Sequence, residues 1–325
     1  MDHINFPYRA SSHLALLHVV NECGAWERQN LDVNYTFKIS SKDAHRQVPT
    51  SEIEFVGGNH VSTYAHRARG DSWTYIGQTV NMLHHKLVVR PDSGIDQIAD
   101  LRQRKVLTSG SHPALNDWLY LKQRGLDVDR DEVEIVNRSR VKKGEMDEAE
   151  GANAPKKPKW ELVRDGTVDA TLLSNPLAAF AARAGLKVID VEPLPMIHFT
   201  TLSTSQAFVD KHPDIVERFL KGILEGIAFF KTRRAESVKI IKERHRTEGV
   251  LDDEMAEDLY SELAQVLEPK LYPSMAAIAN VYEEALRQDA DAAKVNPLTL
   301  WNLHFVRKLD DSGFVRDLYK QPAKS

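Results

Sequence analysis

Short apolar runs alternate with longer amphipathic runs along the first 200 residues. The runs that predict strands cover residues 4–8, 31–39, 53–56, 73–80, 86–89, 105–107, 133–136, 168–173 and 187–191. The runs that predict helices between them cover residues 12–23, 60–68, 95–101, 113–124 and 176–184. Regular alternation of strand and helix is typical of an α/β fold with a mainly parallel sheet.

The last third of the chain has a helical pattern instead. Apolar residues recur there at spacings of three and four, which places one apolar stripe on a helix: Ile215, Phe219, Ile223, Ile227 and Phe230. Further amphipathic runs predict helices over residues 235–246, 252–267, 275–288 and 298–308. The α/β part is therefore expected to carry a helical C-terminal segment.

Residues 138–160 interrupt the alternation with runs of charge. Residues 138–143 are mainly basic, 145–150 are mainly acidic, and 155–159 are basic again. A solvated loop is the plain interpretation of such a segment, and Trp160 would anchor its far end. A lid or a subunit contact is the alternative, because long loops in compact domains often carry function.

Composition narrows the class of protein. The 325 residues suggest two domains, and 43 basic against 47 acidic residues give a net charge of −4, which argues against a nucleic-acid partner. The single cysteine, Cys23, excludes an internal disulfide and any site built from several cysteines.

The first residues and the apolar runs bear on location. Met1-Asp2-His3 leads directly into the first apolar run, without the basic and then apolar regions of a signal peptide. No apolar stretch reaches the roughly 18–20 residues of a membrane span. These features predict a cytoplasmic protein without a membrane span, or a periplasmic one if a signal peptide has been removed.

Four loops follow predicted strands at the edge where open α/β sheets bind ligands. The first contains Arg9, Ser11, Ser12 and His13, where the arginine can bind a carboxylate or sulfonate through two hydrogen bonds. The second is Gly57-Gly58-Asn59-His60, in which Gly58 lets backbone N–H groups approach a ligand and His60 is expected to open a helix. Helix capping by the serines or by Asn59 is the competing role.

The other two loops lie in the second half of the α/β pattern. Thr108, Ser109, Gly110, Ser111 and His112 combine hydroxyls with a predicted helix N-terminus, which is an arrangement that holds anions. Ser174 and Asn175 follow the strand that ends at Leu173 and form the fourth candidate loop.

Several of the 13 histidines fall near these loops. His84 and His85 are adjacent on an extended segment and must point to opposite faces; we take His84 as the candidate, although the sequence does not decide between them. With His13, His60, His112 and His198 they suit acid–base chemistry. No pair has the spacing of a zinc motif, so no metal site is predicted.

Two segments resemble a known family. Residues 87–118, LVVRPDSGIDQIADLRQRKVLTSGSHPALNDW, and residues 204–231, TSQAFVDKHPDIVERFLKGILEGIAFFK, resemble type II periplasmic-binding-protein-like chains. The nearest branch contains the alkanesulfonate-, nitrate- and taurine-binding proteins and the thiamine-pyrimidine precursor synthases. The resemblance implies two lobes joined by crossovers near 82–85 and 195–200. Lobe one would hold residues 1–84 and 196–325, lobe two would hold residues 85–195 with the charged loop, and a ligand would bind in the cleft between them.

The resemblance leaves two functions open. The first is binding of a small polar or anionic molecule, which can be aromatic, in the manner of a solute-binding protein. The second is a cytoplasmic enzyme on the same fold, a decarboxylase or related lyase similar to the 4,5-dihydroxyphthalate decarboxylases, with His60, His112 and His198 as its catalytic residues. The thiamine-pyrimidine synthases carry a cysteine-rich run that this chain lacks. A small molecule is the expected partner, no cofactor is expected, and homo-oligomer formation is left open.

Overall fold

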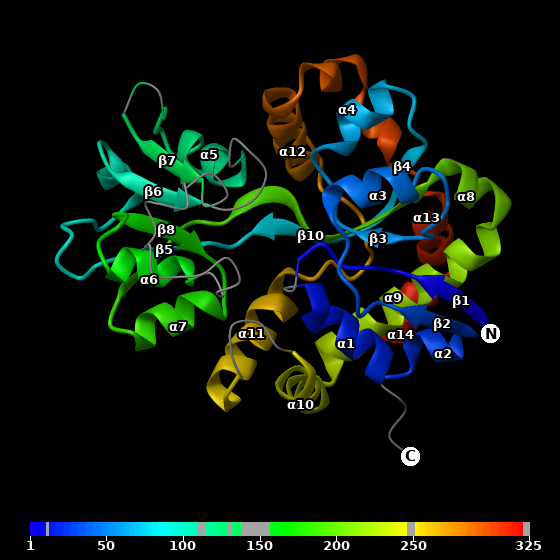
Figure 1. Ribbon diagram of the computed structural model, residues 1–325. Coiled ribbons are helices and arrows are strands. Elements are labelled where there is room, and N and C mark those ends of the chain that lie inside the picture. The colour runs from blue at the N-terminus through cyan, green and yellow to red at the C-terminus, as the bar shows by residue number, and fades with distance from the viewer. Residues whose placement is uncertain are drawn as a thin grey trace, which may run out of the picture. The chain divides into compact units, whose positions relative to one another are not determined.

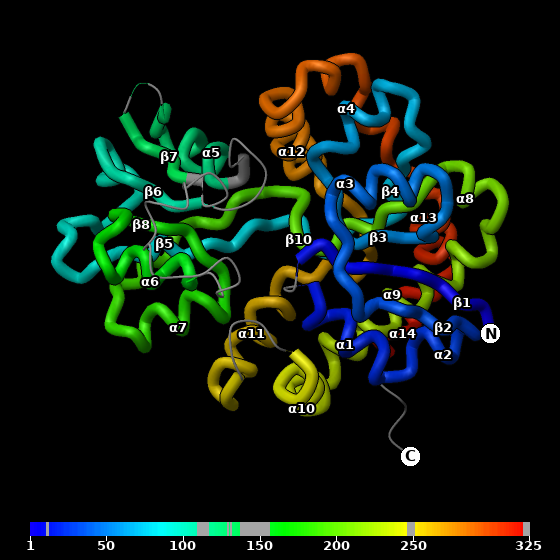
Figure 2. Tube along the Cα trace, viewed as in Figure 1, coloured from blue at the N-terminus to red at the C-terminus, as the bar shows by residue number. Residues whose placement is uncertain are grey.

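The computed structural model describes residues 1–10, 13–108, 115–128, 130, 132–137, 157–245 and 251–320. The chain divides into two compact units (Figure 1). Unit 1 consists of Met1–Leu83 and Pro195–Ser325, and unit 2 consists of His84–Leu194. In Figure 2 the colour runs from blue at the N-terminus to red at the C-terminus. Unit 1 combines segments from both ends of the chain, whereas unit 2 is one continuous stretch.

Unit 1 contains two small sheets. β1 (Asp2–Asn5) pairs in parallel with β2 (Leu31–Asn34). The second sheet has the order β3 (Val56–Gly57), β10 (Leu194–Ser205), β4 (Trp73–Leu83), and β3 runs antiparallel to β10. The register places Leu202 opposite Gly57, which brings the turn after β3 beside the middle of β10.

The helix α9 (Pro213–Thr232) forms the centre of the helical part of unit 1. Proline is accommodated in its first turn, where the N–H has no helical partner. Phe219, Ile223 and Ile227 are fully buried, so the stripe expected from the sequence faces the core. α9 packs against α1 (Leu14–Glu22) and α2 (Ala25–Arg28) (Figure 1).

The remaining helices of unit 1 surround these elements. They are α3 (Ser41–Gln47), α4 (Thr63–Ala68), α8 (Gln206–Lys211), α10 (Arg234–Arg244), α11 (Asp253–Val266), α12 (Met275–Gln288), η3 (Ala290–Lys294), η4 (Pro297–Leu300), α13 (His304–Asp311) and α14 (Phe314–Leu318). The helix expected over residues 298–308 is wrong as a single element, because η4 ends at Leu300 and α13 begins at His304. The helix expected over residues 275–288 is confirmed.

Unit 2 is built on one five-stranded sheet. Its order is β7 (Glu134–Asn137), β6 (Lys105–Thr108), β8 (Ala170–Leu173), β5 (Lys86–Val89), β9 (Lys187–Asp190). β6 runs parallel to β7 and β8, whereas β5 runs antiparallel to β8 and β9. The expectation of a mainly parallel sheet is therefore wrong, because a buried strand shows the same apolar run in either direction.

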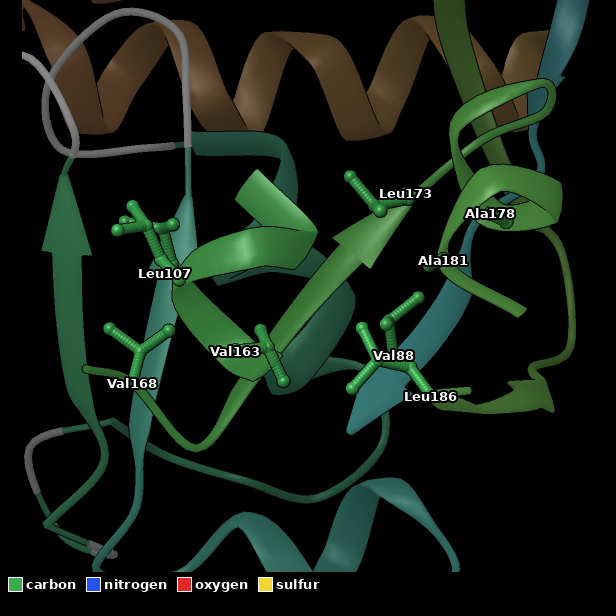
Figure 3. Packing of buried hydrophobic residues seen from close by; sticks show 9 residues of the cluster. Val88, Leu107, Val163, Val168, Leu173, Ala178, Ala181 and Leu186 are labelled. Atoms are coloured by element: carbon green, nitrogen blue, oxygen red, sulfur yellow. The ribbon is translucent and has the colours of Figure 1, made fainter. Parts of the chain in front are cut away.

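Helices cover this sheet and bury its apolar side chains. They are η2 (Ile98–Leu101), α5 (Leu115–Lys122), α6 (Lys159–Arg164) and α7 (Leu177–Arg183). Val88, Leu107 and Leu173 from the strands pack with Val163 from α6 and Ala181 from α7 (Figure 3). This core fixes the ends of β6 and β8, where the candidate loops of unit 2 begin.

The charged segment lies mostly outside the described residues. The structure describes residues 157–160 of it, and α6 already begins at Lys159. Trp160 is thus a helical residue that packs against the core of unit 2, so the loop expected over 138–160 is wrong for its last two residues.

Candidate functional site

Three histidines and one arginine gather in unit 1. Arg9 follows β1, His13 directly precedes α1, His60 lies in the turn after β3, and His198 lies on β10. The rings of His60 and His198 are 6.2 Å apart between centroids, and their planes are nearly perpendicular. The charge of Arg9 acts on both His13 and His60, so these residues form one cluster, which we call the histidine–arginine cluster.

Two glycines allow the histidine–arginine cluster to form. Gly58 has a φ of +123°, and a Cβ there would lie 2.8 Å from Cγ of Arg9. A Cβ on Gly57 would lie 3.1 Å from Cγ2 of Thr200 and 3.4 Å from Nδ1 of His13. The turn can therefore pass this close to Arg9 and His13 only because it lacks side chains at both positions.

The backbone of Gly58 is already hydrogen-bonded. Its N–H donates to the carbonyl of Thr201 over 2.9 Å, and its carbonyl accepts from the hydroxyl of Ser203 over 2.8 Å. The expectation that this N–H faces a ligand is therefore wrong. Gly58 serves the site by making room for the Arg9 side chain.

Burial holds the three histidines in the neutral form. The pKa of His13 is lowered to about 3, mainly by burial and also by the nearby His198, His60 and Arg9, while a hydrogen bond with the Gly57 backbone acts in the opposite direction. Burial likewise lowers the pKa of His60 to about 3, with help from His198 and Arg9, and that of His198 to about 4. Part of the surface of His60 and of His198 nevertheless remains exposed to solvent. A dissolved small molecule can therefore reach both side chains.

The helix expected to begin at His60 begins three residues later, at Thr63. His60 thus lies in a turn, and the helix has only six residues. The low pKa of His60 comes from burial and neighbouring positive charge, not from a helix N-terminus.

Arg9 supplies a positive charge that no acid of the described residues neutralises. Its guanidinium is half-buried and donates from Nη1 to the backbone carbonyl of Ile39. Among the residues that the structure describes, no carboxylate forms an ion pair with it. Burial lowers the pKa of Arg9, yet arginine keeps its charge at any physiological pH.

Several buried polar atoms of the turn after β3 and of the stretch of β10 beside it have no hydrogen-bond partner in the described part of the chain. They are Nδ1 of His60, Oδ1 of Asn59, Oγ1 of Thr200 and Oγ1 of Thr201. Buried polar atoms are normally paired, so a group of unpaired ones beside a free cation is suited to a polar ligand. Sequence reasoning missed Thr200 and Thr201, because their nearness to the turn depends on the pairing of β3 with β10.

A second group of polar residues lies at one edge of the sheet in unit 2. Lys86 pairs with Leu173, so the residues just outside this pair, His85 and Ser174, share that edge. Thr108 ends the parallel strand β6 at the same edge, and its buried hydroxyl has no partner in the described residues. Asn175 follows Ser174, and the Asn175–Pro176 peptide bond is cis.

His85 contacts a buried acid that the sequence analysis did not select. Nδ1 of His85 lies 3.5 Å from Oδ1 of Asp117 on α5. Burial raises the pKa of the Asp117 carboxyl to about 6, although the charge of Lys159 acts to lower it. His84 is partly buried, and burial and the charge of Lys86 lower its pKa. Asp117 could have been identified from the sequence, because it is an acidic residue among apolar ones in the helix predicted over residues 113–124.

The structure thus places the predicted site residues in two groups. Unit 1 brings together Arg9, His13, Asn59, His60 and His198, and unit 2 carries Thr108, Ser174, Asn175 and His84. The remaining candidates, Ser11, Ser12, Ser109, Ser111 and His112, lie outside the described residues. Across the described ranges, no three residues among His, Cys, Asp and Glu are arranged to hold a metal ion.

Comparison of the sequence with protein families gives one match. The model described as "NMT1/THI5 like" matches residues 12–236, which is more than half of the chain. The chain belongs to the NMT1/THI5-like family. No curated protein sequence matches this family member significantly.

Solved structures similar to this NMT1/THI5-like protein share its fold over almost the whole chain. The putative periplasmic sulfonate-binding protein SsuA from Methylobacillus flagellatus KT is 13% identical, with a TM-score of 0.70, and the match covers 100% of this chain and 98% of that one. The alkanesulfonate-binding protein SsuA from Xanthomonas axonopodis pv. citri, bound to MOPS, is 12% identical, with a TM-score of 0.61 and coverage of 93% and 98%. The desulfurization enzyme DSZB is 15% identical, with a TM-score of 0.63 and coverage of 96% and 99%.

These comparisons confirm the resemblance and the fold class. The α/β fold of type II periplasmic-binding-protein-like chains is the fold of this NMT1/THI5-like protein. In the described part of the chain, every helix is too short or too polar to cross a membrane. The expected cytoplasmic location finds no support, since the SsuA neighbour from Methylobacillus flagellatus is described as periplasmic.

Proposed function

We propose that this NMT1/THI5-like protein binds a small organic anion, a sulfonate or a carboxylate, with Arg9 as the residue that pairs with the acidic group. The observation that carries the proposal is the half-buried Arg9 guanidinium without a carboxylate partner in the described residues. A charge removed from water without a partner is unfavourable, and a bound anion would remove that penalty. The guanidinium also fits the planar or tripodal oxygens of such groups through paired hydrogen bonds.

The surroundings of Arg9 favour an anion in two further ways. Among the described residues, the charge of Arg9 lowers the pKa of His60 and no carboxylate raises it, which favours an anion beside this ring. The unpaired atoms of His60, Asn59 and Thr200 offer hydrogen bonds to the rest of a polar ligand. In unit 2 we propose Thr108, Ser174 and Asn175 as a separate group of polar contacts for a small molecule. We take units 1 and 2 as the two lobes expected from the sequence.

The names of the structural neighbours support the same class of ligand. Two of them are described as sulfonate-binding proteins, and one of these holds the sulfonate MOPS. The periplasmic location that the sequence analysis gave as its alternative is consistent with the described location of the Methylobacillus protein. The net charge of −4 argues against a nucleic-acid partner.

An enzyme of the decarboxylase or lyase type is the alternative. Its support is the group of neutral imidazoles around His13, His60 and His198, which can exchange protons with a bound molecule, and the presence of one enzyme among the similar folds. A bound compound that is recovered unchanged after long incubation would argue against this alternative for that compound.

Isothermal titration calorimetry in a Tris–chloride buffer tests the proposed function, because common sulfonate buffers would compete for the site. The panel contains MOPS, short alkanesulfonates, benzenesulfonate and benzoate. We expect Arg9→Gln to weaken binding of the best ligand by about 10- to 100-fold, which is the value of a charged hydrogen bond, and Arg9→Lys to weaken it less.

Arg307→Gln is the matched control, because Arg307 is 78% exposed and pairs with Asp311 on the surface of α13. It should bind as the wild type does. The proposal is wrong if no anion of the panel binds the wild type, or if Arg9→Gln and Arg307→Gln behave alike. Mass spectrometry of the recovered ligand decides between binding and turnover.

A further inference from the structure

A second group of histidines lies behind the turn that carries His60. His45 on α3 and His66 on α4 stack face to face, with ring centroids 3.6 Å apart and planes 7° from parallel. Nδ1 of His66 lies 2.8 Å from Oδ2 of Asp71. The ring of Trp73 packs edge-on against His45, with centroids 5.2 Å apart. These contacts hold the His45 ring in one orientation.

The Nε2 atom of His45 faces the turn. The Ser62 hydroxyl lies 2.8 Å from it, and Nδ2 of Asn59 donates to it over 3.3 Å. Asn59 and Ser62 are the residues on either side of His60 and Val61, so His45 contacts the turn both before and after His60. Nδ1 of His45 is buried and has no partner in the described residues.

The turn needs such support because its backbone conformation is uncommon. Gly58 and Asn59 have consecutive positive φ angles, +123° and 59°. Asparagine tolerates the left-handed conformation better than most residues. The Asn59 carbonyl accepts from the hydroxyls of Thr63 and Tyr75, and the Asn59 side chain is held separately, by His45. The ring of His60 cannot help, since its own Nδ1 is unpaired in the described residues.

The charge state of His45 suits this role. Its pKa is lowered to about 4, mainly by burial and also by His66 and Arg9, while the charge of Asp71 acts in the opposite direction. His45 is therefore neutral at physiological pH. With its proton on Nδ1, the imidazole has one lone pair at Nε2, which the Ser62 hydroxyl at 2.8 Å and the Asn59 amide at 3.3 Å share as donors.

We propose that His45 is a positioning residue of the anion site, because its hydrogen bonds to Asn59 and Ser62 fix the turn that presents His60 beside Arg9. This inference rests on the proposed function of the histidine–arginine cluster and adds a residue that does not itself touch the ligand. It assigns the Asn59 side chain to the support of the turn and leaves its Oδ1 for the ligand.

Two substitutions separate the hydrogen bonds of His45 from its packing. His45→Phe keeps a flat ring between His66 and Trp73 but cannot accept from Asn59 or Ser62. His45→Gln loses the ring but places an amide near the position of Nε2. We expect His45→Phe to weaken binding of MOPS about tenfold and His45→Gln to stay within about threefold of the wild type, as expected for one to two hydrogen bonds.

His66→Phe is the control for stability. The phenylalanine ring can still stack on His45, but the contact of residue 66 with Asp71 is lost. The variant should therefore destabilise the same region without removing a hydrogen bond between His45 and the turn. We expect its affinity for MOPS to be unchanged even where its melting temperature falls. If affinity follows the melting temperature across the three variants, His45 has only a structural role and the inference is wrong.

Hydrogen exchange of the ligand-free protein gives a second measurement that does not depend on binding. His45→Phe should speed exchange in the peptide that covers residues 57–62, whereas His45→Gln and His66→Phe should not. If MOPS fails to bind the wild type but this exchange pattern appears, the choice of ligand is wrong and the role of His45 stands. If the exchange of residues 57–62 is the same in all variants, the inference is overturned whatever MOPS does.

Discussion

The ring of Phe199 lies against that of His13, with centroids 5.2 Å apart, and Phe199 reaches this position with a backbone φ of 62°. A bulky residue in the left-handed region is a backbone outlier that costs about 1–2 kcal/mol. It lies on β10 between His198 and Thr200, so the backbone is distorted between two residues of the candidate site. Strain of this kind persists where the surrounding contacts fix it, and it concentrates at functional sites.

At position 199, glycine should be no less stable than alanine, which is the reverse of their usual order of stability in a strand. In a strand, glycine is normally less stable than alanine by about 0.5–1 kcal/mol. At a φ of 62° the Cβ of alanine is strained and glycine is not, so Phe199→Gly should be at least as stable as Phe199→Ala. Both should lose about 3–5 kcal/mol relative to the wild type because a buried ring is removed. Urea denaturation measures the difference, and a Phe199→Ala variant clearly more stable than Phe199→Gly would contradict the role of backbone strain.

Asp117 makes the stability of the protein depend on pH. Burial raises the pKa of its carboxyl from 3.8 to about 6 in the folded state, so the folded protein holds the proton more tightly than the unfolded chain does. Its contribution to stability is greatest below pH 4 and is lost as the pH rises through 6. Asp117→Asn mimics the protonated acid and should stabilise the protein at pH 7 by up to about 3 kcal/mol, with little effect at pH 4.

Thermal unfolding from pH 4 to pH 8 measures this dependence. Asp92→Asn serves as its control, since Asp92 is 86% exposed. An Asp117→Asn variant that is less stable than the wild type at pH 7 would show that the contact with His85 outweighs the burial of the charge.

His13 has the opposite dependence. Its pKa falls from 6.5 to about 3 in the folded state, so the unfolded chain binds the proton more readily. The contribution of neutral His13 is complete above pH 6.5 and is lost as the pH falls toward 3, at up to about 1.4 kcal/mol per pH unit. His13→Gln should therefore flatten the loss of stability between pH 6 and pH 4.

A bound ligand should change the protonation of the histidines in the histidine–arginine cluster. An anion beside His60 and His198 favours their protonated forms, because its negative charge stabilises a positive charge on rings that burial keeps neutral. Binding near pH 5 should therefore take up protons. Calorimetry of MOPS binding in two buffers with different ionisation enthalpies measures this uptake directly. An observed enthalpy that is the same in both buffers would show that the bound group stays away from the histidines.

Gly226 lies where α9 meets α1. A Cβ at this position would lie 2.4 Å from Cγ2 and 2.9 Å from Cα of Val20, and the latter atom is part of the backbone. Gly226→Ala should destabilise the protein by about 1–3 kcal/mol through overpacking. A Gly226→Ala variant more stable than the wild type by about 1 kcal/mol would contradict this prediction. That is the gain expected where alanine replaces an unhindered glycine in a helix, and it would show that α9 and α1 can move apart at no cost in free energy.

The sequence predicted elements well where local pattern decides them. The strand at residues 86–89 and the helix at 275–288 have the expected bounds, because each is one uninterrupted run between clear end signals. The short helix α3 was missed, since Ser41–Gln47 contains only one apolar residue that is buried, Ala44. β3 has only two residues, Val56 and Gly57, because its extent is set by the pairing with β10.

The candidate site shows the same division. Arg9, His13, Asn59 and His60 were found because they follow predicted strands in loops with an evident use. His45, Asp117, Thr200 and Thr201 were missed because their roles depend on contacts between distant segments. His45 lies on a helix without a pattern, and its link to Asn59 appears only when α3 packs behind the turn.

The sheet that orders β3, β10 and β4 also determines when unit 1 can form during synthesis. β3 and β4 are synthesised before residue 84. Their central partner, β10, is complete only at Ser205, after the whole of unit 2 has been made. Unit 2, as one continuous stretch, can fold as soon as it emerges. β3 and β4 must therefore wait with unpaired edges, although β1 and β2 can already pair with each other. The histidine–arginine cluster cannot form before His198 has been synthesised.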